Sequence, residues 1–202
     1  MTTNKKLVVA VIALSLALVC VVGATLAYLV AQSNVVTNTF TYGDIEIELW
    51  ETDLNGTKTD SGVEYPGIVP GDTVNKNPTV TVKAKSEACW VYAKVTNNVV
   101  INGKTVANYE VNNGWTAIGS NGTTTLYRYN TKIEYSESDS DLTAVFNTVK
   151  FDDELEVDDI AALKADSNAK ITVTAYAHQA DHVDMADADA YAITWAGVLA
   201  SN

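Results

Sequence analysis

Cysteine and histidine are scarce in this sequence of 202 residues, which holds two of each. Cys20 falls in an apolar N-terminal run that we expect to be removed, and Cys89 would then be the only thiol. A lone cysteine excludes an internal disulfide in the processed chain. Because Cys89 opens an apolar strand pattern, a buried and inert thiol is a better interpretation than a nucleophile or an intermolecular bridge.

Positive charge is also scarce. The chain holds 13 Lys and Arg residues against 25 Asp and Glu residues, which gives a net charge of −12. Without Lys5 and Lys6 of the N-terminal segment the balance becomes 11 − 25, or −14. An acidic surface argues against nucleic acid and against anionic lipid surfaces as partners. Simple colloidal solubility is the preferred explanation of this charge.

Catalytic motifs are lacking too: the sequence contains no Gly-x-Ser-x-Gly, no Gly-Lys-Thr phosphate loop and no Cys-x-x-Cys. The histidines stand in His178-Gln179-Ala180-Asp181-His182, four residues apart. On a helix this spacing could hold zinc, but zinc proteases need a glutamate after the first histidine, and Gln179 cannot accept a proton. We therefore expect two polar residues at a strand end, with His178 and His182 as weak candidates for metal ligands.

Carboxylates and aromatic residues are abundant without forming a specific pattern. Carboxylates gather in residues 137–141, 152–159 and 181–189, where calcium could bind, but the EF-hand spacing is missing. Solvated acidic loops are the preferred interpretation, so no cofactor is expected, with calcium or zinc left open. Aromatic side chains on two strands could form a carbohydrate-binding platform, but their packing inside the sandwich is the preferred interpretation. These side chains are Trp90, Tyr92, Tyr127 and Tyr129.

The N-terminal segment carries the clearest signal. Lys5 and Lys6 precede an apolar run over residues 7–22, and small residues follow it. This pattern predicts a secretory signal peptide, with Thr25 and Ala27 at positions −3 and −1 and Tyr28 as the first mature residue. We therefore expect a secreted protein of the extracellular matrix or cell surface. Left uncut, the run would be long enough to anchor the chain in a membrane.

The remaining sequence alternates polar and apolar residues in short stretches between turn residues, which predicts many strands. We expect strands at residues 44–49, 79–83, 90–96, 99–101, 104–106, 124–129, 132–135, 144–150 and 170–177. Asn102-Gly103 predicts a tight hairpin turn. Helices are expected at residues 158–165 and 184–199. In the second helix, one apolar stripe should pack on the sheets: Met185, Ala188, Ala192, Trp195, Ala196 and Leu199.

The expected fold class is mainly β: an antiparallel, jelly-roll-like β-sandwich with one or two short helices, preceded by an N-terminal signal helix. Residues 1–27 would be the signal peptide, residues 28–40 an N-terminal strand or arm, and residues 41–202 the sandwich domain.

Three segments resemble, in the same order, the TasA/camelysin-type exported proteins of Gram-positive bacteria. The first is the apolar run with Gly-Ala-Thr-Leu-Ala-Tyr at residues 23–28, followed by residues 37–47. The second is a Pro-Gly-Asp turn and strand within residues 69–80, and the third is a strand ending in Gln-Ala-Asp within residues 171–181. The middle of the chain, about residues 102–166, carries no match.

The resemblance implies a jelly-roll subunit, processed by a dedicated signal peptidase, that assembles into fibres of the biofilm matrix. The mature N-terminal strand would complete the sheet of the next subunit, through Leu29, Ala31, Val35, Val36 and Phe40. The implied partners are other copies of the chain, the signal peptidase and, beyond these, other matrix proteins or polysaccharide. Two alternatives stay open: a camelysin-like cell-surface metalloprotease, weakened by the missing glutamate, and a wall carbohydrate-binding or adhesion module.

Overall fold

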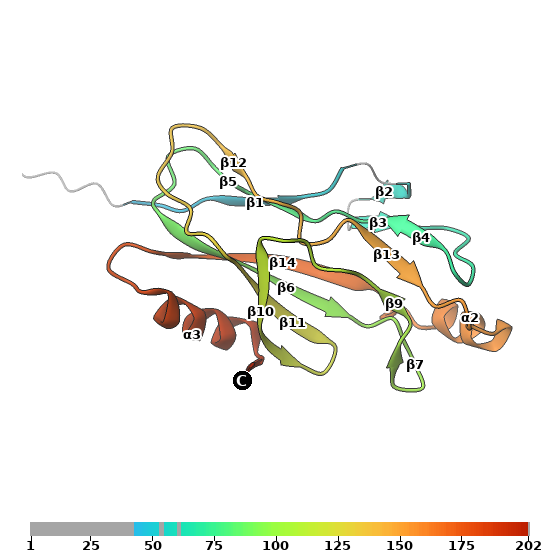
Figure 1. Cartoon of the computed structure of the whole chain (residues 1–202). Coiled ribbons are helices and arrows are strands. Elements are labelled where there is room, and N and C mark those ends of the chain that lie inside the picture. Colours follow the sequence, from blue (N-terminus) through green and yellow to red (C-terminus); the bar gives the residue numbers. More distant parts are fainter. Residues whose placement is uncertain (1–42, 53–54, 60–61, 202) are drawn as a thin grey trace, which may run out of the picture. The chain divides into compact units, whose positions relative to one another are not determined.

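A computed structural model describes residues 43–52, 55–59 and 62–201, which belong to the second of two compact units of the chain, residues 42–202. The predicted signal peptide and N-terminal arm lie outside the described residues. The described part is mainly β, with antiparallel sheets and two helices, as predicted (Figure 1). Within it, neither helix combines the length and the apolar character that a membrane crossing requires.

One layer of the sandwich is a five-stranded sheet in the order β14-β6-β11-β10-β15. Its strands are β6 (Cys89–Asn97), β10 (Trp115–Asn121), β11 (Thr124–Tyr129), β14 (Ile171–Gln179) and β15 (Leu199–Ala200). β6 and β14 are nine residues long and pair along their whole length. They form the longest ladder of the described residues, with β14 at one edge of this sheet.

The second layer contains two short sheets that continue each other. The first has the order β1-β5-β12 and the second the order β4-β13-β9. Hydrogen bonds from Val145 N to the Pro78 carbonyl (2.8 Å) and from Lys76 N to the Asn147 carbonyl (3.0 Å) bridge the gap between them. The strands are β1 (Ile47–Trp50), β4 (Thr73–Asn75), β5 (Thr79–Val82), β9 (Ala107–Asn108), β12 (Ser140–Asp141) and β13 (Thr148–Phe151).

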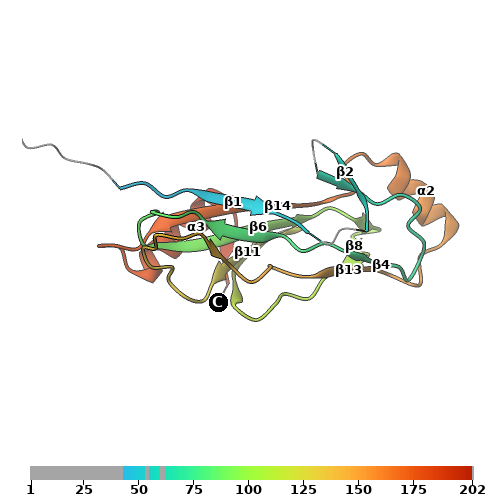
Figure 2. The same cartoon turned by 90° about the horizontal axis from the view of Figure 1, so that it is seen from above.

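Two hairpins and two helices complete the described unit. The hairpins are β2 (Thr57–Thr59) with β3 (Gly62–Glu64), and β7 (Val100–Ile101) with β8 (Lys104–Thr105). The helices are α2 (Val157–Ala165) and α3 (Met185–Ala196). The hairpin β2–β3 and α2 lie at one end of the sandwich and α3 at the other (Figures 1 and 2).

The main core lies between the two layers, where alternate residues of each strand point inward. Val91, Ala93 and Val95 of β6 meet Val80 and Val82 of β5, and all five are buried. The predicted inward face of residues 90–96 is therefore confirmed. A smaller core lies between the outer face of the five-stranded sheet and α3, and it consists of Tyr92, Leu126, Ala188, Ala192 and Val198.

Cys89 belongs to the main core and is fully buried. Burial raises the pKa of its thiol to about 11, so the thiol stays protonated at neutral pH. The prediction of a buried thiol is therefore confirmed, and because only the thiolate is a good nucleophile, its burial is consistent with a structural role.

Several predicted elements need correction. The strand predicted at residues 44–49 begins only at Ile47. Residues 132–135 form no strand, because Ile133 makes only an isolated bridge with Cys89. The strand predicted at residues 144–150 begins only at Thr148. The helix predicted at residues 184–199 ends at Ala196, because Gly197 adopts a left-handed conformation (φ 69°) that stops it. Leu199 therefore leaves the predicted stripe. It lies in β15, pairs with Ser120 of β10 and is 75% exposed.

Candidate assembly surface

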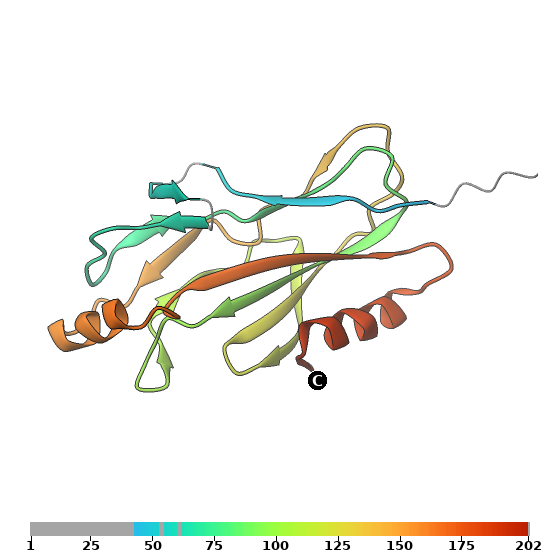
Figure 3. The ribbon, with the colours of Figure 1, turned by 180° about the vertical axis from the view of Figure 1, so that it is seen from behind.

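The two layers each end in an open strand on the same side of the sandwich. β14 is bonded only to β6, and β1 only to β5, among the described residues. β1 and β14 lie side by side without a ladder between them (Figure 3). β14 is the longer of the two, nine residues against four, so it offers the larger row of backbone groups to a further strand.

The register of β14 against β6 shows which of its backbone groups face the open side. Asn98 N donates to the Lys170 carbonyl (3.0 Å), and Ala180 N donates to the Ala88 carbonyl (2.7 Å). Because hydrogen-bonded pairs alternate with non-bonded pairs in an antiparallel ladder, the even-numbered residues of β14 bond to β6. The N–H and C=O groups of Val173, Ala175 and Ala177 consequently point away from β6, toward the open edge.

Nothing in the sequence of β14 guards this edge. Natural edge strands are protected against further pairing by charged side chains, proline, bulges or short length. The segment Ile-Thr-Val-Thr-Ala-Tyr-Ala-His-Gln has no Asp, Glu, Lys, Arg or Pro, and its register with β6 shows no shift. An unguarded edge of nine residues is a template for strand addition.

The side chains of β14 hold the strand firmly against the sandwich. Ile171, Val173, Ala175 and Ala177 pack against the main core. On the outer face, the ring of Tyr176 stacks on Trp195 of α3, with ring centroids 5.0 Å apart. Contacts on both faces therefore hold β14 in place.

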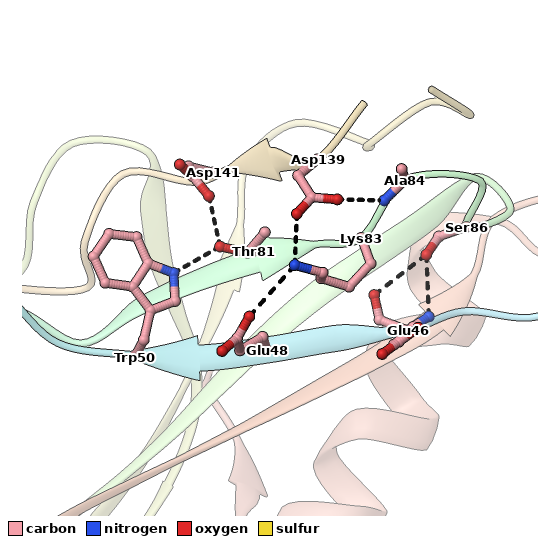
Figure 4. Close-up of polar contacts among 9 residues, drawn as sticks. All are labelled: Glu46, Glu48, Trp50, Thr81, Lys83, Ala84, Ser86, Asp139 and Asp141. Carbon is pink, nitrogen blue, oxygen red and sulfur yellow. Dashed lines mark hydrogen bonds and ion pairs between the residues drawn. The ribbon is translucent and has the colours of Figure 1, made fainter. Parts of the chain in front are cut away.

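The neighbouring strand β1 is held by polar contacts on the outer face of its sheet, which Figure 4 shows. The Trp50 indole donates to Thr81 Oγ1 (2.7 Å), and the Thr81 hydroxyl donates to Asp141 (2.6 Å). Thr81 is buried, so this relay joins the three strands of the sheet. Ser86 Oγ accepts from Glu46 N (3.1 Å) and fixes the chain just before β1.

Lys83 adds a charged contact to the same face. Its ammonium group lies 2.5 Å from Asp139 and 3.4 Å from Glu48 (Figure 4). The hydrogen bond from Lys83, followed by one from Ala84 N, lowers the pKa of Asp139 below its ordinary value. A lowered carboxyl pKa stabilises the fold at neutral pH, and this contribution is lost as the pH falls through the pKa of Asp139 in the folded protein.

α3 is fastened to the outer face of the five-stranded sheet through Asp189. This carboxylate accepts a hydrogen bond from the Tyr92 hydroxyl (3.0 Å) and forms an ion pair with Arg128. Burial, reinforced by Asp189, raises the pKa of Tyr92, so its hydroxyl remains a donor. The predicted stripe of the helix is correct at Ala188 and Ala192, which are fully buried.

His178 and His182 do not form the helical pair that a zinc site would need. His178 lies in β14, where its ring stacks on Tyr191 (centroids 4.8 Å apart, 15° between planes) and its Nδ1 lies 2.9 Å from the Gln179 carbonyl. His182 lies in the turn after the strand, with a φ of 62°. Throughout the described ranges, no group of three His, Cys, Asp or Glu residues could hold a metal ion.

The aromatic residues named as a carbohydrate platform are mostly inside the protein. Tyr92 and Tyr127 are buried, and Trp115 meets Tyr129 edge to face at 5.1 Å. The preferred interpretation, sandwich filling, is therefore confirmed for Tyr92 and Tyr127. Two other rings are exposed on α3, Tyr191 (60%) and Trp195 (37%), each backed by a ring of β14. The sequence prediction placed Trp195 in the apolar stripe of the helix and did not single out Tyr191.

The predicted processing and assembly residues lie outside the described residues. These are Thr25, Ala27 and Tyr28 at the cleavage point, and Leu29, Ala31, Val35, Val36 and Phe40 in the arm. The open edge of β14, by contrast, is a feature that strand prediction alone could not identify, since pairing partners must be known before an edge is recognised.

Comparison of the chain with protein-family models, with curated proteins and with solved structures finds no significant match.

Proposed function

We propose that this chain is a secreted structural protein whose copies polymerise by strand addition into fibres of the extracellular biofilm matrix. The observation that carries the proposal is the edge of β14, which has no pairing partner among the described residues and no charged residue or proline. The backbone N–H and C=O groups of Val173, Ala175 and Ala177 point to this side, while side-chain contacts hold the strand on both faces. The resemblance to TasA-type proteins supports the same role. In this proposal the protein acts as a scaffold, and no catalytic step is assigned to it.

The strand that would be added is the N-terminal arm of another copy. Residues 29–40 contain Leu29, Ala31, Val35, Val36 and Phe40 and no proline or glycine, so the arm can extend and pair. At ~3.3 Å per residue the twelve residues span about 40 Å, enough to cover the roughly 30 Å of β14. When the arm of one copy pairs with the acceptor edge of another copy, the contact is head-to-tail and does not close, which gives filaments.

Polysaccharide binding is a second candidate, favoured by the exposed rings of Tyr191 and Trp195. Aromatic faces held by stacking are suited to the apolar faces of sugar rings. The metalloprotease alternative is not proposed, because the histidines it would use lie on a strand and in a turn.

Ala175→Pro tests the proposal at the acceptor edge. Proline at this position removes an N–H that points to the open side and leaves every bond between β14 and β6 in place, so the fold should survive. We expect the secreted chain to lose filament formation, measured by electron microscopy and by sedimentation. Ala175→Gly keeps the N–H and is the matched control, which should still form filaments. Normal filaments of a folded Ala175→Pro protein would contradict the acceptor role of β14.

A further inference from the structure

A cavity of about 680 Å³ lies at the α2 end of the sandwich. Its walls are residues 63–69, which begin in β3, then parts of β4 and β13, and α2 with the connection that follows this helix. This volume falls within the roughly 300–1,000 Å³ of small-molecule sites. No residue of α2 is fully buried, although Ile160 and Leu163 line the cavity, so the helix spans this space without filling it.

Apolar side chains form the larger part of the lining of the cavity. Val74, Val99 and Val149 are buried at its base, and Phe151 and Leu155 are half-buried beside them. Tyr65 also lines it, but the Tyr65 hydroxyl already donates to the Asn75 carbonyl. These apolar side chains offer contact surface for a hydrocarbon chain.

Basic side chains outnumber acidic ones in the lining of the cavity, against the balance of the whole protein. Among the described residues, Lys76, Lys164 and Lys170 line it, and Glu64 is the one carboxylate in that lining. Lys76 pairs with Glu51 at 2.7 Å, whereas Lys164 and Lys170 form no ion pair with the described residues. These two lysines flank Ser167 in the connection between α2 and β14. In a chain of net charge −12, a cavity with apolar lining and two lysines that have no ion-pair partner among the described residues is suited to an anionic amphiphile.

We propose that this cavity binds one long-chain fatty acid, with the carboxylate between Lys164 and Lys170 and the hydrocarbon chain against the apolar base. The N-terminal arm is a poorer occupant, because residues 28–42 contain no Asp or Glu that could meet the lysines. Neutral lipids would leave the same two charges unmatched. The site goes beyond the proposed scaffold role and does not depend on polymer formation.

The test is a fluorescence titration of the secreted chain with 11-(dansylamino)undecanoic acid, followed by displacement with oleate. We expect saturable binding of one probe per chain and full displacement by oleate. Oleyl alcohol and oleylamine, which have the hydrocarbon chain of oleate but lack the carboxylate, should displace the probe about tenfold less well. Absence of saturable binding, or equal displacement by oleyl alcohol, would overturn the proposal, as would better competition by a peptide of residues 28–42 than by oleate.

Lysine variants locate the carboxylate. Lys164→Gln with Lys170→Gln should weaken oleate binding about tenfold, since both changes remove charge from the lining of the cavity. Lys85→Gln with Lys150→Gln removes two lysines that do not line the cavity and should leave binding unchanged. Equal affinities of the two double variants would contradict the assignment. Filament formation, scored on the same samples, separates this outcome from failure of the scaffold proposal.

Discussion

Removal of residues 28–38 from the secreted chain is expected to leave a folded, soluble monomer that forms no filaments. The physical reason is that the open edge of β14 remains but the strand that would pair with it is gone. Sedimentable protein should fall to the level of the buffer control, while the far-UV circular dichroism keeps its β-sheet form. If the shortened protein builds the same filaments, then the arm is not the connector.

Point changes within the arm sharpen this experiment. Val35→Asp places charge at an apolar position on the strand face that also carries Leu29 and Ala31 and should be buried on assembly, so it should abolish filaments. Asn34→Asp introduces the same charge on the opposite face of the strand and is the matched control. A loss of filaments in both variants would indicate general charge repulsion and would count against burial of the apolar residues.

Asp189→Ala is expected to give the largest loss of stability among single changes at the α3 interface. The change leaves Arg128 without its ion-pair partner and the buried Tyr92 hydroxyl without its acceptor. Removing one member of such a partly buried set costs about 3 kcal/mol. For a domain of this size that lowers the melting temperature by roughly 6–12 °C, which thermal unfolding followed by circular dichroism measures.

A neighbouring aspartate provides the control. Asp187 lies in the first turn of the same helix, and its side chain makes no bond with the described residues. Asp187→Ala should cost at most ~1 kcal/mol, the size of a helix-dipole interaction. Asp189→Asn keeps an acceptor for Tyr92 but loses the charge, so its effect should fall between the two. Equal melting temperatures of Asp187→Ala and Asp189→Ala would mean that Asp189 does not fasten α3.

Local sequence signals were sufficient where a residue's conformation depends on its neighbours in the chain. Asn102 and Gly103 both have positive φ (51° and 79°), as the predicted hairpin turn between β7 and β8 requires. The alternation of polar and apolar residues at 124–129 and 79–83 likewise predicted the bounds of β11 and β5 to within one residue. These features are set by turn chemistry and by period-two burial.

Features that depend on distant contacts were missed. β10 was not predicted, because Gly119 and the polar residues around it resemble a loop. In the fold a Cβ on Gly119 would lie 2.7 Å from the Leu199 carbonyl, so the glycine permits β15 to approach. The open edge of β14 and the cavity beneath α2 depend in the same way on which strands become neighbours. The sequence therefore predicted the class of fold, while the candidate surfaces needed the structure.

Amide hydrogen exchange on β14 tests the strand-addition mechanism most directly. In the monomer, the outward N–H groups of Val173, Ala175 and Ala177 should exchange rapidly, while those of Thr174 and Tyr176, which bond to β6, should be protected. In filaments dissolved for residue-specific readout after exchange, the three outward groups should become protected as well. Exchange of Val173, Ala175 and Ala177 that is as fast in filaments as in the monomer would contradict pairing of the N-terminal arm with β14.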